Sequence, residues 1–249
     1  MRRYRFAARA LGALAVAAFV PGLFVPRGTA DAQAGPTLRF LTEESGRFSY
    51  VENGEVRGIF VDLMREVARR ADVDASFDLL PWKRAYEGAL TEPDACVFAT
   101  TMTDERRPQF KWVAPLAFNK WALLGLKARH IRLGRLEDAK PYVIGVYEGD
   151  ARQAYLKQRG FTLAPVSRNE LNISGLETGR IDLWASSAYA PFELGGEVSS
   201  KLESVLEFHS VELGVACNVA LSDAITTRLN TALAQVRAER GLDRGDGAN

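Results

Sequence analysis

Residues 142–187 read YVIGVYEGDARQAYLKQRGFTLAPVSRNELNISGLETGRIDLWASS. Short apolar runs that suit β-strands alternate in this stretch with segments that suit α-helices. The predicted strands cover residues 142–147, 161–166 and 181–186, and the predicted helices cover residues 151–158 and 169–178. Alternation of this kind is typical of an α/β protein.

The same alternation occurs earlier in the chain. Residues 37–42 alternate with period two, and residues 60–71 carry apolar side chains at helical spacing. The Asn53-Gly54 dipeptide lies between two short extended runs and predicts a small hairpin. Further strands are predicted at residues 76–80 and 96–100, with a helix at residues 82–90 between them.

Two such runs, separated by long extended segments, predict two lobes between which the chain crosses twice. The crossings are expected near residues 117–122 and 208–214. The first lobe then comprises residues 35–116 and 215–249, and the second comprises residues 117–214. Paired extended crossings form a hinge, so a small molecule is expected to bind in the cleft between the lobes.

The N-terminus has the pattern of a secretory signal peptide, residues 1–34. Arg2 and Arg3 precede a short apolar run, and Ala32-Gln33-Ala34 is an A-x-A site, with Ala30-Asp31-Ala32 as a second candidate. The run is too short to span a bilayer, so we expect cleavage near Ala34 rather than anchoring. The arginine pair also fits a twin-arginine signal. Without a cysteine to carry a lipid, the mature protein is expected in the periplasm.

The composition excludes several classes of function. Lys and Arg number 32 and Asp and Glu 31, without a basic stripe, which argues against nucleic-acid binding. The chain has two histidines and two cysteines and no C-x-x-C motif, so we expect no metal site, no cofactor and no Cys/His nucleophile. Cys96 and Cys217 each lie in an apolar, strand-like run. We favour buried thiols that pack as small hydrophobic groups, with a disulfide as the alternative in an oxidising compartment.

The segment Thr101-Met102-Thr103-Asp104-Glu105-Arg106 carries a candidate anion site. Thr103 followed by two acids suits the start of a helix, which would place Arg106 in the first turn beside free backbone N–H groups. A guanidinium, hydroxyls and helix-end amides would then converge on one carboxylate. The alternative, which the local sequence alone favours, is a capped surface helix with a solvated arginine.

Several motifs together resemble the family 3 bacterial extracellular solute-binding proteins, the amino-acid-type binding components of ABC importers. Each motif is weak alone, but their order and spacing are specific, and the resemblance covers residues 37–242. The motifs are Gly58-Ile59-Phe60-Val61-Asp62-Leu63, Pro81-Trp82-Lys83-Arg84-Ala85, Thr101-x-Thr103-x-Glu105-Arg106, Phe110-x-Trp112-x-x-Pro115, Val143-Ile144-Gly145-Val146-x-x-Gly149 and Gly179-Arg180-Ile181-Asp182.

The resemblance implies a two-lobed, periplasmic-binding-protein-like (type II) α/β fold with mixed sheets. It also implies a monomer that delivers a small-molecule ligand to an ABC permease in the inner membrane and performs no chemistry. The family arginine that grips the ligand carboxylate falls on Arg106, with Thr101 as its hydroxyl partner. The aromatic residue that stacks on the ligand falls on Tyr50 or Phe48, and for Phe48 we favour packing in the core.

Two positions depart from the family pattern. The acid that pairs with a ligand ammonium falls on Ser187, and the threonine or serine after Gly149 is replaced by Asp150-Ala151. A buried ammonium without a partner costs several kcal/mol. Either the ligand has no ammonium there, or Asp150, Glu148 or Glu44 supplies the counter-charge. The fold therefore carries over from the family, whereas the ligand does not.

Three further candidates have structural alternatives. Glu44 follows the first strand and is either a ligand acceptor or part of a solvated loop. Trp82 is either a wall of the cleft or a core residue, and Asp150 is either a ligand contact or the N-cap of a helix. The predicted ligand-binding residues are Arg106, Thr101, Tyr50, Glu44, Trp82, Asp150 and Ser187.

Two other functions compete with solute delivery. The fold resembles that of cyclohexadienyl dehydratase, whose elimination chemistry would need a positioned acid or base, for which Glu44 and Asp150 are the candidates. A sensory module that reports occupancy to a receptor would use the same cleft. We predict binding without catalysis, in which the ligand docks on Arg106 and Thr101 and then recruits Asp150 and Ser187 as the lobes close.

Overall fold

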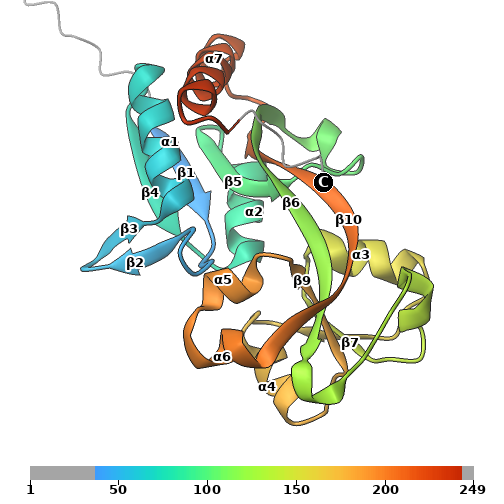
Figure 1. Ribbon diagram of the computed structural model, residues 1–249. Helices are drawn as coiled ribbons and strands as arrows, with labels where there is room; N and C mark the ends of the chain where they lie inside the picture. The colour runs from blue at the N-terminus through green and yellow to red at the C-terminus, as the bar shows by residue number, and fades with distance from the viewer. Residues whose placement is uncertain (1–36, 243–249) are drawn as a thin grey trace, which may run out of the picture. The chain divides into compact units, whose positions relative to one another are not determined.

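The computed structural model describes residues 37–242, so the predicted signal peptide lies outside the described residues. An eight-stranded mixed sheet in the order β4-β1-β5-β10-β6-β9-β7-β8 organises this part of the chain (Figure 1), and it confirms the α/β class. Its strands are β1 (Leu38–Thr42), β4 (Ala75–Leu79), β5 (Ala95–Thr101), β6 (Lys111–Leu126), β7 (Ile144–Tyr147), β8 (Leu163–Val166), β9 (Leu183–Ser187) and β10 (Leu202–Cys217).

The helices lie against this sheet, and none within residues 37–242 has the length and apolar character to cross a membrane. They are α1 (Ile59–Arg70), α2 (Trp82–Thr91), α3 (Ala151–Gln158), α4 (Leu171–Glu177), α5 (Ala190–Leu194), α6 (Gly196–Lys201) and α7 (Asp223–Glu239), with short 3-10 helices η1 (Arg107–Gln109), η2 (Lys127–Arg129) and η3 (Leu136–Ala139).

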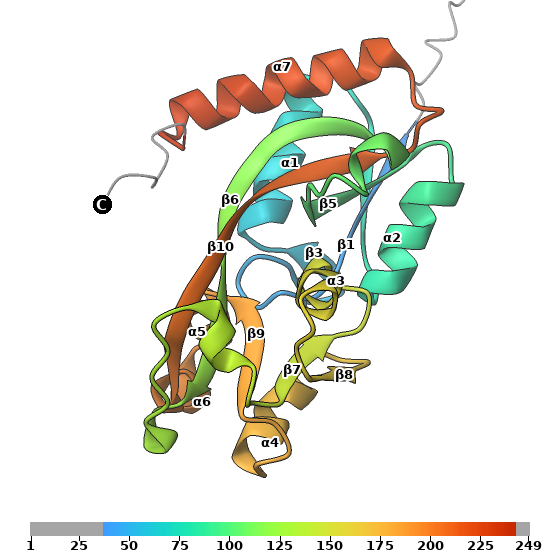
Figure 2. The same ribbon diagram turned by 90° about the vertical axis from the view of Figure 1, so that its right-hand side faces the viewer.

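Strands β6 and β10, of 16 residues each, run antiparallel side by side through the whole structure (Figure 2). At one end β10 pairs with β5, and β1 lies parallel to both β4 and β5. At the other end β6 pairs with β9, and β7 lies parallel to both β8 and β9. The predicted crossings, residues 117–122 and 208–214, pair with each other within these two long strands.

Buried apolar side chains form four clusters along this frame. Two of them gather around β1, β5, α1, α2 and α7, and two gather around β7, β9 and α4. Strand β6 contributes Val113 to a cluster at one end and Leu123 to a cluster at the other. Because the same two strands serve both groups, the described residues share one continuous sheet, and we retain the two-lobe division as a proposal.

The small hairpin is confirmed. β2 (Tyr50–Glu52) and β3 (Glu55–Arg57) pair antiparallel around Asn53 and Gly54. Both turn residues have left-handed backbones, with φ of 52° and 80°. This conformation is that of the turn which an Asn-Gly dipeptide favours in a two-residue hairpin.

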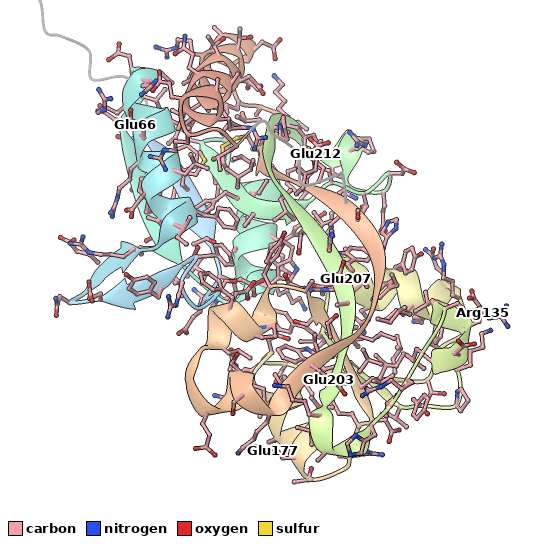
Figure 3. The ribbon with its side chains drawn as sticks, viewed as in Figure 1. Glu66, Arg135, Glu177, Glu203, Glu207 and Glu212 are labelled. Atoms are coloured by element: carbon pink, nitrogen blue, oxygen red, sulfur yellow. A yellow bond between two sulfur atoms is a disulfide. The ribbon has the colours of Figure 1, made fainter. Side chains whose placement is uncertain are left out.

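Cys96 and Cys217 form a disulfide with an S–S distance of 2.05 Å (Figure 3), so the interpretation as two free thiols was wrong. The bond joins β5 to β10 across 121 residues of sequence, and both residues are fully buried. The two residues are direct partners in the antiparallel register of the strands. Residues that are opposite each other in such a ladder are close enough to bond, and this pairing was not visible in the local sequence.

Gly145, in the strand motif of the second half, has a packing reason. A Cβ at this position would lie 2.3 Å from Asn172 Oδ1 and 2.4 Å from Ile181 Cδ1. Helix α4 and the segment before β9 therefore approach the β7 backbone more closely than any side chain permits. Gly145 therefore permits the close packing of α4 and the segment before β9 against β7.

Candidate functional site

Arg106 lies in the turn between β5 and η1, and only 8% of its surface is exposed. The Thr103 hydroxyl accepts a hydrogen bond from the Arg106 backbone N–H at 3.2 Å, so Thr103 caps the turn before η1. The N-cap of η1 itself is Arg106, not Thr103 as predicted. The segment that follows is a short 3-10 helix rather than an α-helix. The alternative of a solvated arginine was wrong, because the guanidinium turns inward under the aromatic side chains of α2.

The Arg106 guanidinium lies over two aromatic rings, 5.2 Å from the Trp82 ring centroid and 5.0 Å from that of Tyr86. Nη1 donates to the Thr101 carbonyl oxygen at 3.4 Å, and Nη2 donates to the Gly149 carbonyl oxygen at 3.2 Å. Thr101 therefore contacts Arg106 through its backbone, and the role of its hydroxyl stays a prediction. Cation–π contacts and carbonyl acceptors hold the guanidinium plane in one orientation.

No ion pair joins Arg106 to a carboxylate within residues 37–242, and its guanidinium donates two hydrogen bonds to carbonyl oxygens. A guanidinium has five N–H donors, so several remain for another acceptor. A buried charge without a counter-ion is costly, and a carboxylate that accepts two parallel hydrogen bonds would offset that cost. A role of Arg106 in binding an anion stays a prediction.

Contacts across the structure bring the ends of β5 and α2 against the loop that precedes α3. The Trp82 indole Nε1 donates to the Gly149 carbonyl oxygen at 3.1 Å, and the Trp82 backbone N–H donates to the Tyr147 hydroxyl at 3.3 Å. Ser45, after β1, donates to Glu193 in α5 at 3.3 Å. We call these contacts, with the Arg106–Gly149 bond, the junction. Trp82, 7% exposed, forms part of it.

Asp150 is the N-cap of α3, as the alternative interpretation predicted. Its Oδ1 accepts from the Arg152 backbone N–H at 2.7 Å and from Arg152 Nε at 2.8 Å, and its Oδ2 accepts from Arg152 Nη2 at 2.6 Å. Burial by itself would raise the pKa of Asp150, but the charge and hydrogen bonds of Arg152, with the charge of Arg106, lower it. Arg152 was not among the predicted site residues, although it directly follows Asp150-Ala151, where the sequence departs from the family pattern.

Glu43, rather than Glu44, faces this buried ion pair. Burial, with the neighbouring charge of Asp150, raises the pKa of Glu43 to about 8, while Arg152 and a hydrogen bond with Tyr147 act in the opposite direction. Glu44 is exposed. Successive side chains of an extended segment point to opposite sides, so only one of two adjacent acids can face inward, and the sequence did not show which.

Ser187 and Tyr50 are placed differently from Arg106. The Ser187 hydroxyl donates to Asn119 Oδ1 at 2.8 Å and accepts from the Tyr189 backbone N–H at 3.0 Å, so this hydroxyl is already engaged. Tyr50 is half-buried on β2, in the hairpin. Phe48 stacks on Phe60 with ring centroids 4.8 Å apart, which confirms packing for Phe48. The ligand roles of Tyr50, Glu44 and Ser187 stay predictions.

The model of the bacterial extracellular solute-binding proteins, family 3, matches residues 38–244. The chain belongs to this family. Within residues 37–242, no three His, Cys, Asp or Glu side chains are grouped so that they could hold a metal ion.

Solved structures share the fold of this family 3 protein, although no curated protein matches its sequence. An ancestral arginine-binding protein bound to glutamine is 22% identical over 84% of this chain and 95% of its own, with a TM-score of 0.71. A histidine kinase sensor domain with similarity to periplasmic binding proteins is 17% identical over 83% and 92%, with a TM-score of 0.75. The amino acid ABC transporter substrate-binding protein AbpA from Streptococcus pneumoniae, bound to L-arginine, is 17% identical over 84% and 92%, with a TM-score of 0.72.

A methyl group at Gly46 is expected to force the junction of this family 3 protein apart. Gly46 has φ of 47°, and a Cβ there would lie 2.3 Å from the Glu193 carbonyl oxygen in α5. Gly46→Ala should therefore lower ligand affinity by roughly tenfold, a change of about 1.4 kcal/mol. Titration calorimetry would measure the affinity.

Gly54→Ala is the matched control for Gly46→Ala. Gly54 also has a left-handed backbone, with φ of 80°, but no atom lies within 4 Å of the added Cβ. Equal losses of affinity in the two variants would assign the effect to backbone strain and contradict a role for the contact with α5.

The stability of the family 3 protein should rise on acidification because of Glu43. Its pKa is about 8 in the folded structure against an ordinary value of 4.5, so the folded state binds more protons between these pH values. The contribution is complete below about pH 4.5 and is lost as the pH rises through about 8. Thermal unfolding across this range should show the slope in the wild type and a smaller slope in Glu43→Gln. Glu44→Gln should keep the wild-type slope, and an unchanged slope in Glu43→Gln would exclude Glu43 as its source.

Proposed function

We propose that the mature protein is a periplasmic solute-binding protein that captures a small polar, carboxylate-bearing ligand between two lobes for an ABC-type importer. The observation that carries this proposal is the Arg106 guanidinium. It is buried, oriented by Trp82 and Tyr86, and hydrogen-bonded to the carbonyl oxygens of Thr101 and Gly149, without an ion pair to a carboxylate among residues 37–242. A ligand carboxylate is the acceptor that its remaining donors fit.

The junction supplies the mechanism of capture. Arg106 and Trp82, from the first proposed lobe, both donate to the Gly149 carbonyl of the second. A ligand held by Arg106 would lie beside the same loop and could add contacts to Asp150 at the start of α3. Such a ligand stabilises the closed arrangement because it contacts both lobes only there. Thr101, Tyr50, Glu44 and Ser187 complete the proposed binding set.

The partner and the location belong to the same proposal. A signal peptide over residues 1–34, cleaved near Ala34, would deliver a monomer to the periplasm, where an inner-membrane permease would recognise its closed form. AbpA, a neighbour in fold, is described as an ABC transporter substrate-binding protein, which supports delivery to an importer. The histidine kinase sensor domain supports the sensory alternative. Ligand uptake by cells that lack this protein would separate the two, because only the delivery role makes uptake depend on it.

A thermal-shift screen of the mature protein tests the binding proposal. Carboxylates, amines, sugars and neutral polar molecules would each be added, and a ligand that binds the folded state raises the melting temperature. We expect the shifts to come from compounds that carry a carboxylate and the bound compound to be recovered unchanged after release. Shifts confined to compounds without a carboxylate would overturn the anion site, and a chemically altered product would overturn binding without catalysis.

A further inference from the structure

Gln109, in η1, joins the turn that carries Arg106 to helix α2. Its side-chain Oε1 accepts a hydrogen bond from the Tyr86 hydroxyl at 3.0 Å, and its Nε2 donates to the Glu105 carbonyl oxygen at 2.9 Å. A carbonyl oxygen can only accept, so the amide nitrogen must face Glu105 and the amide oxygen must face Tyr86. The Tyr86 hydroxyl is therefore the donor of the first bond.

Both groups that this amide binds are neighbours of Arg106. The Tyr86 ring centroid lies 5.0 Å from the Cζ atom of the Arg106 guanidinium. Glu105 directly precedes Arg106 in the chain, so its carbonyl oxygen belongs to the peptide unit that leads into Arg106. One amide group therefore ties a ring that faces the guanidinium to the backbone that carries it.

The two carbonyl acceptors hold the Arg106 guanidinium through long hydrogen bonds. The bonds to the Thr101 and Gly149 carbonyl oxygens measure 3.4 and 3.2 Å, whereas N–H···O hydrogen bonds in proteins are most often about 2.9–3.0 Å long. Bonds of this length restrain a side chain weakly. The cation–π contacts with the two aromatic rings therefore matter for the orientation of the guanidinium.

Each of these two rings is anchored through a polar atom. Trp82 Nε1 donates to the Gly149 carbonyl oxygen. The Tyr86 hydroxyl donates to Gln109. The Tyr86 ring also packs against Trp82 and Phe110, with centroid distances of 5.5 and 5.2 Å. Packing limits the movement of the ring, and the bond to Gln109 fixes its hydroxyl end.

We infer that Gln109 is a positioning residue, which acts through the Tyr86 hydroxyl to hold the Arg106 guanidinium in the orientation that meets a ligand carboxylate. This inference rests on the proposed carboxylate site at Arg106. A guanidinium that is oriented before the ligand arrives loses less conformational freedom on binding. Loss of the Gln109–Tyr86 bond should therefore weaken binding although no charge is removed.

Affinity measurements on the mature protein test the route from Gln109 to Arg106. Propanoate, glutarate, L-glutamine and L-arginine serve as probes, and the probe with the largest thermal shift is titrated by calorimetry. Gln109→Met and Tyr86→Phe should each raise the Kd about threefold to tenfold, the range for one neutral hydrogen bond. The double variant should bind no more weakly than Gln109→Met alone, because both changes break the same contact. Gln158→Met makes the same substitution at the exposed end of α3 and should keep the wild-type Kd.

The motion of the Arg106 guanidinium distinguishes positioning from a general loss of structure, and it can be measured without a ligand. Nuclear magnetic relaxation of the Arg106 Nε–H group, assigned by its absence in Arg106→Lys, reports the order of this group on the ps–ns timescale. We expect a rigid group in the wild type and in Gln158→Met. Its order parameter should fall in both Tyr86→Phe and Gln109→Met. Tyr86→Phe removes one oxygen atom, so it keeps the test available if Gln109→Met does not fold.

The two measurements separate failure of the inference from failure of the proposed function. An unchanged order parameter of Arg106 in both variants would overturn the inference, whatever the Kd values are. A double variant whose loss of affinity is the sum of the two single losses would also overturn it. A looser Arg106 with a wild-type Kd would support the positioning role of Gln109 and count against the carboxylate site. If none of the four probes binds, the relaxation measurement alone decides the positioning role, and the proposed function loses support.

Discussion

Arg106→Ala is expected to weaken carboxylate binding by about 100-fold or more. Loss of one partner of a buried, hydrogen-bonded charge pair typically costs about 2–5 kcal/mol, and tenfold in affinity corresponds to about 1.4 kcal/mol. Arg106 meets this description because it is 8% exposed and its orientation is set by Trp82 and Tyr86. Arg106→Lys should bind with intermediate affinity, since an ammonium keeps the charge but lacks the two parallel donors. Titration calorimetry with a carboxylate found in the thermal-shift screen would measure all three proteins.

Arg107→Ala is the matched control for Arg106→Ala. Its side chain is 53% exposed and lies 3.9 Å from Asp104, so this variant removes a positive charge from the adjacent position without reaching the junction. It should bind within a few tenths of a kcal/mol of the wild type, as for an exposed pair. Equal weakening of binding in both variants would show that the effect comes from the loss of net positive charge. Wild-type affinity in Arg106→Ala would show that Arg106 does not bind the ligand.

Replacement of both cysteines, Cys96→Ala with Cys217→Ala, is expected to lower the free energy of unfolding by about 4–5 kcal/mol. The disulfide closes a loop of 121 residues, and in the chain-entropy model a loop of roughly 100 residues is worth about 4.7 kcal/mol. The bond also lies within the larger core cluster, beneath α1 and α7, where both residues are fully buried. Urea unfolding followed by tryptophan fluorescence and by circular dichroism would measure the change.

Wild-type protein that is kept reduced during unfolding is the control for the double cysteine variant. It should show the same midpoint as the variant, because both lack the cross-link in the unfolded chain. If the free energy of unfolding falls by less than about 1 kcal/mol in both the variant and the reduced wild type, the unfolded chain gains little conformational freedom when the disulfide is absent.

The local pattern of residues predicted most of the elements. The alternating apolar runs of residues 142–187 became β7, α3, β8, α4 and β9, with boundaries shifted by a few residues. The Asn53-Gly54 turn, the Thr103 cap and the Asp150 cap were also visible in sequence, because each depends on hydrogen bonds or backbone angles within four residues. Arg106 was singled out by the same local pattern together with the family resemblance.

Other features needed the tertiary structure, because they join residues far apart in the chain. Antiparallel register set Cys96 opposite Cys217, which reversed the favoured interpretation of two thiols. The inward turn of Glu43 in place of Glu44, and the charge interactions of Arg152 with Asp150, Glu43 and Glu193, depend on how distant elements pack.

The sequence by itself determined the α/β class, the family and the arginine at the centre of the candidate site. These follow from periodicity, capping and short motifs, whose physical causes are local hydrogen bonding and the burial of one face. Only the tertiary structure decided whether a charge is paired, shielded or exposed. Solvation and Coulomb energies depend on distances between groups that come together only when β1, α3 and α5 pack against one another.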